Sequence, residues 1–124
     1  MKKILCSTGA LIGMPNNRDF SLIKKCVPNI NSDGFEFMMY STWYDKVHNL
    51  LKELKKCETE FPVMHCEKHI GEDLGKNADG NFYTAKEKFK VNCEIANEIG
   101  AKRMVMHLWD GIYSDTTIEN NIKG

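Results

Sequence analysis

Short apolar segments alternate with longer amphipathic segments along the chain, and this alternation restricts the possible fold more than any other feature. The apolar segments, typical of buried strands, are residues 3–8, 33–41, 61–66 and 102–107. Apolar residues recur at helical spacing between them, over 20–27, 43–54 and 84–99. The strand starts recur roughly every 30 residues, which is the length of a β-α-β unit. The sequence therefore predicts an α/β domain with parallel strands.

The number of β-α units favours one half of a larger barrel. A TIM barrel, (β/α)8, has twice as many units, and here a fourth helix is expected to begin at Ser114 or Asp115, close to the last residue. We therefore expect residues 1–124 to form a single partial domain, the N-terminal half of a (β/α)8 barrel. A small doubly wound domain with four parallel strands is the alternative, although such domains usually close with a complete helix.

The segment after the third expected strand is rich in Gly, Asp and Asn, and it predicts a long polar loop that reaches Asn81. Thr84 and Glu87 have the T-x-x-E spacing of a capping box, which predicts a helix start at Thr84. Gly100 is expected to end that helix. The side chains expected to be solvated on the polar loop are Glu67, His69, Glu72 and Asp73.

Composition excludes several classes of partner. The chain has 17 Lys and Arg against 17 Asp and Glu, a formal net charge of +0. This balance provides no general attraction to nucleic acid or to an anionic membrane. No stretch approaches the 18 or so apolar residues of a membrane span. The five cysteines include no C-x-x-C pair, and most fall within apolar patterns, as reduced core thiols do. We therefore expect a cytoplasmic protein with neither a nucleic-acid nor a membrane partner.

Two of the expected strands end in a histidine. His65 closes the third strand and His107 the fourth, and β-α folds bind their ligands at the carboxyl ends of strands. Two imidazoles there can bind one divalent metal or polarise a substrate oxygen. We predict that His65 and His107 approach each other and form a site. The alternative for each is a hydrogen bond to a loop carbonyl. Trp109 is a further candidate, for the wall of the pocket.

A carboxylate within the second expected strand is another candidate. Glu36 lies between Phe35 and Phe37, so alternation places it on the face opposite the two aromatic rings. A carboxylate in a parallel strand needs a cation, a metal or hydrogen bonds. Either a structural ion pair with a lysine or arginine inside a barrel, or a role at the substrate, is consistent with this position. Motifs for a nucleophilic serine, a dinucleotide or a zinc protease are absent from the sequence.

Three segments resemble the xylose isomerase-like TIM barrels. They are "DGFEFMMY" in the second strand, "VMHCEKH" in the third, and "ANEIGAKRMVMHLWDG" from the third helix into the fourth strand. This superfamily contains sugar phosphate isomerases and epimerases, enzymes of inositol catabolism and endonuclease IV-type nucleases. The resemblance extends over all 124 residues, and these correspond to the N-terminal half of a typical member.

The resemblance implies roles for residues named above. Glu36 corresponds to a glutamate that lines the barrel interior. His65 and His107 correspond to histidines that bind zinc in endonuclease IV-type members and more often contact the substrate in the epimerases. In the epimerases, the metal ligands and the two proton-transferring glutamates come from strands five to eight.

The leading interpretation is therefore the N-terminal half of a metal-dependent sugar or sugar-phosphate isomerase or epimerase, which uses Mn²⁺, Mg²⁺ or Zn²⁺ and an enediolate in the complete barrel. The alternatives are a metal phosphodiesterase of the endonuclease IV type and a non-catalytic half-barrel that associates. Because half a barrel leaves open strand edges, we also expect a homo-oligomer.

Overall fold

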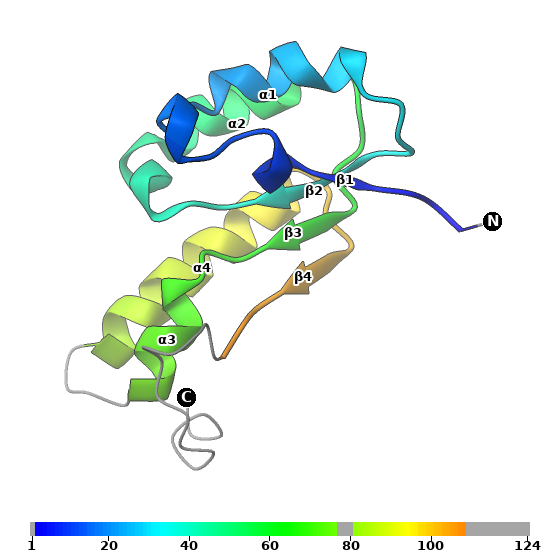
Figure 1. Ribbon diagram of the computed structural model, residues 1–124. Helices are drawn as coiled ribbons and strands as arrows, with labels where there is room; N and C mark the ends of the chain where they lie inside the picture. The colour runs from blue at the N-terminus through cyan, green and yellow to red at the C-terminus, as the bar shows by residue number, and fades with distance from the viewer. Residues whose placement is uncertain (1, 77–80, 109–124) are drawn as a thin grey trace.

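The computed structural model describes residues 2–76 and 81–108, which form one parallel sheet and the helices packed on it (Figure 1). The four strands lie in the order β1-β2-β3-β4. Their bounds are β1 Cys6–Ser7, β2 Phe35–Met38, β3 Val63–His65 and β4 Arg103–Val105. Each strand lies within a segment for which the sequence predicts a strand, and every pair is parallel. The prediction of an α/β fold with parallel strands is confirmed.

The strand order follows the order of the chain without a reversal. A doubly wound sheet reverses its strand order at a switch point, so the described sheet lacks the feature that defines that alternative. The main connecting helices are α1 Ser21–Cys26, α2 Val47–Lys55, α3 His69–Lys76 and α4 Asn81–Glu98. Short 3-10 turns are η1 Thr8–Ala10, η2 Met14–Asn16, η3 Val27–Asn29 and η4 Ser41–Lys46.

The prediction of a long polar loop after the third strand is wrong. Residues 69–76 form helix α3 instead, because Ile70 and Leu74, one turn apart, bury their side chains against Ala85 of α4. The predicted capping box is wrong for a related reason. Helix α4 begins at Asn81, so Thr84 lies inside the helix and is not its cap. The expected end of this helix is confirmed, since α4 stops at Glu98 and Gly100 adopts a left-handed φ of 73°.

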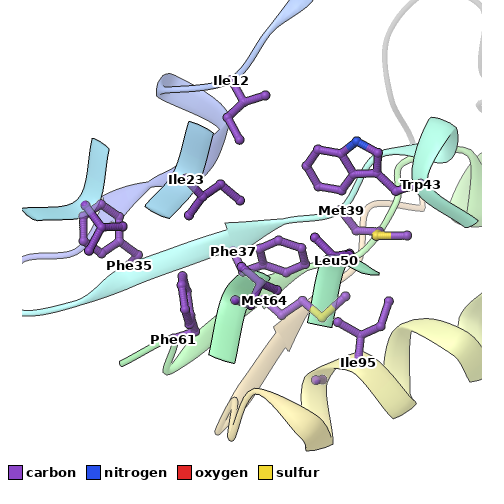
Figure 2. Packing of buried hydrophobic residues seen from close by; sticks show 13 residues of the cluster. Ile12, Ile23, Phe35, Phe37, Met39, Trp43, Leu50, Phe61, Met64 and Ile95 are labelled. Atoms are coloured by element: carbon purple, nitrogen blue, oxygen red, sulfur yellow. The ribbon is translucent and has the colours of Figure 1, made fainter. Parts of the chain in front are cut away.

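The main hydrophobic core lies between the sheet and the helices (Figure 2). Phe37 of β2 has no exposed surface, and its ring centroid lies 6.1 Å from that of Trp43 and 6.3 Å from that of Phe61. Ile23 from α1, Leu50 from α2 and Ile95 from α4 belong to the same cluster. Three helices therefore share one layer of contacts on the sheet, and α2 contacts both α1 and α4.

The opposite face of the sheet is only partly buried. Phe37 and Met64 pair in register and are fully buried under the helices. Glu36 and His65 point to the other face, where their side chains remain 27% and 19% exposed. Among the described elements, helices cover one face of the sheet, and the other carries polar and titratable groups at its carboxyl edge.

Within residues 2–76 and 81–108, no helix combines the length and the apolar composition that crossing a membrane requires.

Candidate functional site

The structure brings His65 and His107 together, which confirms the prediction that they approach each other. Their ring centroids are 5.7 Å apart and their planes differ by 28°. The register explains this arrangement, because His65 pairs with Val105 and His107 follows Val105 by two residues. Alternation then places both imidazoles on the helix-free face of the sheet. Two titratable rings thus stack at the carboxyl edge of neighbouring strands.

Glu36 holds His65 in place from the adjacent strand. Its Oε1 lies 2.5 Å from His65 Nε2, and both side chains are mostly buried. The lysine or arginine partner that the sequence allowed for Glu36 is not found among the ion pairs of the described residues. The carboxylate in the strand is therefore paired with an imidazole of the site.

The contact with Glu36 favours a proton on Nε2 of His65, because a carboxylate oxygen accepts and does not donate. In a neutral ring with that proton, Nδ1 keeps its lone pair. Carboxylate–histidine pairs of this kind orient imidazoles that bind metals or substrates. With its proton on Nε2, His65 can use Nδ1 to accept a hydrogen bond from a hydroxyl group or to bind a metal.

A cavity of about 190 Å³ opens beside the two histidines. Side chains that follow three different strands line it, together with Arg18 from the segment after β1. The others include Tyr40 and Ser41 after β2, Glu67 and His69 after β3, and His107 after β4. This volume is below the roughly 300–1,000 Å³ of typical small-molecule sites.

Glu67 and His69 form a second carboxylate–imidazole pair at this cavity. Glu67 is only 2% exposed, and its Oε1 accepts a hydrogen bond of 3.0 Å from the backbone N–H of His69 and also contacts His69 Nδ1. Its Oε2 is buried without a hydrogen-bond partner in the described part of the chain. The expectation of a solvated Glu67 is therefore wrong, because this side chain turns inward between β3 and α4.

Asn92 of α4 anchors the backbone at Glu67. Asn92 has no exposed surface, and its Oδ1 accepts a hydrogen bond of 3.1 Å from the Glu67 N–H. Its Nδ2 donates to Tyr44 Oη at 3.0 Å and to the Lys88 carbonyl at 2.8 Å. Burial raises the pKa of Tyr44 well above its usual range, and the nearby Glu67 charge adds to this although the Asn92 hydrogen bond opposes it. Neutral Tyr44 thus closes a buried polar network.

Only one feature of the sequence indicates this hydrogen-bond network. Asn92 precedes Ile95 by three residues, so it lies on the apolar face of its helix, where an amide needs partners. Nothing in the sequence indicates that its partners come from residues 44 and 67. His48 is exposed on α2, and Trp43 lies in the core. Trp109 lies outside the described residues, as does the helix expected from Ser114.

Cys66 gives the site a measurable dependence on alkaline pH. Burial raises the pKa of its thiol from 9.0 to about 11, with a further contribution from Cys93. The unfolded chain therefore loses this proton near pH 9 while the folded chain keeps it. Stability is unaffected by Cys66 below pH 9, and it should fall between pH 9 and 11 by up to about 2 kcal/mol.

Urea unfolding at pH 7.5 and at pH 10.5 measures this loss. The alkaline decrease in unfolding free energy should be smaller in Cys66→Ala than in the wild-type chain. Cys26→Ala, which removes a partly buried thiol from α1, is the matched control and should keep the full decrease. An identical decrease in Cys66→Ala and wild type would show that Cys66 does not titrate as its burial implies.

The described residues do not supply a complete metal site. No group of three or more His, Cys, Asp or Glu side chains converges within residues 2–76 and 81–108. His65 and His107 offer two imidazoles, which suit Zn²⁺ better than Mg²⁺ or Mn²⁺, since the latter prefer several oxygen ligands.

Comparisons with family models, with curated protein sequences and with solved structures give no match to this chain.

Proposed function

We propose that this chain forms the first four units of a (β/α)8 barrel that acts as a sugar or sugar-phosphate isomerase or epimerase. One observation carries the proposal. Glu36, His65 and His107 lie together at the carboxyl edge of a parallel sheet, on the face that no described helix covers. Ligands of (β/α)8 barrels bind at this edge.

The sheet supports the barrel part of the proposal. Strands of a (β/α)8 barrel follow one another in chain order, and their helices all lie outside. The described strands have that order, and α1, α2 and α4 contact one another in sequence on one face. The helix-free face, with Glu36, Met38 and His65, would then be the barrel interior. Four further units or a second copy of the chain would have to cover it.

The histidines support the chemical part of the proposal. Isomerisation of a sugar removes a proton next to a carbonyl group, and negative charge then develops on the carbonyl oxygen. Oriented hydrogen-bonding groups stabilise such a charge more than water does. His65, fixed by Glu36, and His107 beside it can hold the oxygens of a polyol or carbonyl substrate. In this proposal the base that removes the proton comes from the other half of the barrel.

A divalent metal is part of the same proposal. When bound, it would supply charge stabilisation at the substrate oxygens. This chain would contribute His65 and His107, and the oxygen ligands would come from the rest of the barrel.

A ligand titration, monitored by NMR of the histidine side chains, tests the proposal. The probes are fructose, ribulose 5-phosphate and a DNA duplex with an abasic site, each added with Zn²⁺ present. We expect a sugar or the sugar phosphate to shift the imidazole resonances of His65 and His107. His65→Gln and His107→Gln should each weaken binding by about tenfold or more, because each removes a hydrogen bond to the substrate.

His48→Gln is the matched control, since His48 is exposed on α2 away from the cavity. Binding should be unchanged in this variant. Binding of the abasic duplex alone would favour a phosphodiesterase and contradict the proposal. The proposal also fails if no probe shifts the two histidines, or if His48→Gln weakens binding as much as His65→Gln.

A further inference from the structure

We propose that Arg18 binds the anionic group of the substrate, a phosphate or a carboxylate, at the cavity beside His65 and His107. The inference rests on the proposed function, because it specifies the charge of the sugar that the site takes. Arg18 is not among the residues that sequence patterns single out. Three independent features of the structure point to it: its backbone conformation, its unpaired side-chain nitrogen and its place on the cavity wall.

The backbone at Arg18 is held in an unfavourable conformation. Asn17 and Arg18 have φ values of 55° and 51°, in the left-handed region that disfavours residues with a Cβ atom. The Arg18 N–H donates to the Gly13 carbonyl at 3.0 Å, and Trp43 Nε1 donates to the Arg18 carbonyl at 2.8 Å. Both peptide groups of Arg18 are thus fixed by neighbours. Conformations of this kind collect at binding sites, where the surrounding structure maintains them.

The guanidinium group lies against an aromatic ring that is itself fixed. Arg18 Cζ lies 5.0 Å from the centroid of the Tyr40 ring. Tyr40 donates its hydroxyl proton to the Ile12 carbonyl at 3.0 Å and packs edge to face on Trp43 at 4.9 Å. The cation–π contact favours this position of the guanidinium on the cavity wall.

One nitrogen of the guanidinium, Nε, lacks a hydrogen-bond partner among the described residues. Its Nε is buried without an acceptor in the described part of the chain, and no carboxylate there forms an ion pair with Arg18. A buried N–H donor without an acceptor is unfavourable, so such groups commonly mark a place that a ligand or water fills. The planar fork of a guanidinium matches the oxygens of a phosphate or carboxylate.

The charges around the cavity favour an anion at the Arg18 end. Its wall carries Arg18 and Lys68 against the single carboxylate of Glu67, and Glu36 lies off the wall, in contact with His65. Because Glu67 already contacts His69 through Oε1, the negative charge lies at the end formed by residues after β3. Ser41, also on the wall, offers a hydroxyl donor from the segment after β2. An oxyanion would therefore bind Arg18 and place the remainder of the sugar toward His65.

Titration of the complete chain with inorganic phosphate at constant ionic strength tests the inference. ¹H–¹⁵N correlation NMR monitors the resonances of the Arg18 Nε–H and the Trp43 indole N–H. We expect saturable binding that shifts the Arg18 Nε–H. Arg18→Gln should weaken it by about tenfold or more, because a charge-assisted hydrogen bond is lost. Arg18→Lys should retain part of the affinity, since it keeps the charge without the planar fork.

Arg103→Gln is the matched control, an exposed arginine on β4 that does not line this cavity. It should leave phosphate binding unchanged. Acetate in place of phosphate distinguishes a carboxylate from a phosphate as the preferred group. Fructose and fructose 6-phosphate then separate the inference from the proposed function, because they differ only in the phosphate group.

Equal weakening by Arg18→Gln and Arg103→Gln would overturn the inference, because it would indicate general attraction to positive charge. So would equal affinity for fructose and its phosphate, a result that leaves the proposed function intact. Phosphate binding at Arg18 without affinity for either sugar would instead contradict the proposed function and leave an anion site. If Arg18→Gln does not fold, the wild-type Nε–H shift and Arg18→Lys decide, and an unmoved Nε–H would count against the inference.

Discussion

Replacing Gly71 with alanine is expected to destabilise the folded chain by about 3 kcal/mol and to separate His107 from His65. Gly71 is buried in the first turn of α3, directly against the backbone that follows β4. A Cβ atom at this position would lie 1.6 Å from the carbonyl oxygen of His107 and 2.6 Å from its carbonyl carbon. Because backbone cannot rotate aside as a side chain can, either α3 or the end of β4 has to move.

The direction of the measured change is informative because two effects oppose each other. Alanine favours a helix over glycine by about 1 kcal/mol, so propensity alone predicts that the variant is more stable. Steric overlap with His107 predicts the reverse and should dominate. Urea unfolding gives the sign, and the loss of a nuclear Overhauser contact between the two imidazoles would show that the histidines have moved apart.

Gly13→Ala is the matched control for this variant. A Cβ atom at Gly13 would meet only Pro15 Cδ at 3.6 Å, an ordinary contact, and its φ of −148° is open to any residue. Stability should change by less than about 0.5 kcal/mol, as for a substitution that breaks no contact. A Gly71→Ala chain as stable as Gly13→Ala would show that α3 does not pack against the His107 backbone.

The arrangement of the sheet could be predicted from the sequence because it depends on local alternation. Phe35, Glu36 and Phe37 show which residues face the helices and which face away, and their side chains lie accordingly. The approach of His65 and His107 follows from the same rule, since parallel strands align their carboxyl ends. Strand alternation and parallel pairing are therefore sufficient to predict where Glu36, His65 and His107 lie.

Helix α3 could not be predicted from composition because its stability comes from two side chains. Ile70 and Leu74 are one turn apart in a segment otherwise rich in Gly, Asp and Lys. Their burial against Ala85 stabilises the helix only once α4 is in place. Local propensity predicts a loop there, and tertiary packing overrides it.

The polar partners at the site depend on contacts between residues far apart in the sequence. Asn92 binds the Glu67 N–H across 25 positions, and Tyr44 lies 48 positions from Asn92. Alternation places Glu36 on the correct face but does not identify His65 as its partner, because a strand has neighbours on both sides. Arg18 lies in an irregular segment, where no helical or strand periodicity of apolar residues indicates the direction of its side chain. The tertiary structure is therefore needed to identify how the site is held together.

Replacing Asn92 with alanine is expected to reduce the free energy of unfolding by about 3 kcal/mol, because two buried polar groups lose their partner at about 1–3 kcal/mol each. The Glu67 N–H loses its acceptor and the Tyr44 hydroxyl loses a donor. The Lys88 carbonyl lies within the same helix and is less affected, since it can still accept the Asn92 backbone N–H. Urea unfolding at pH 7 measures the loss.

Asn97→Ala is the control that isolates burial from helix propensity, because Asn97 lies on the exposed side of the same helix. Both substitutions replace asparagine with a better helix former, so the Asn97 variant should be as stable as the wild type or slightly more stable. The Asn92 variant should also change the environment of His69, whose partner Glu67 loses the anchor on its backbone. Equal stability of the two variants, with His69 unmoved, would mean that Asn92 does not connect α4 to the carboxyl end of β3. The buried Glu67 would then be held in place by something other than α4.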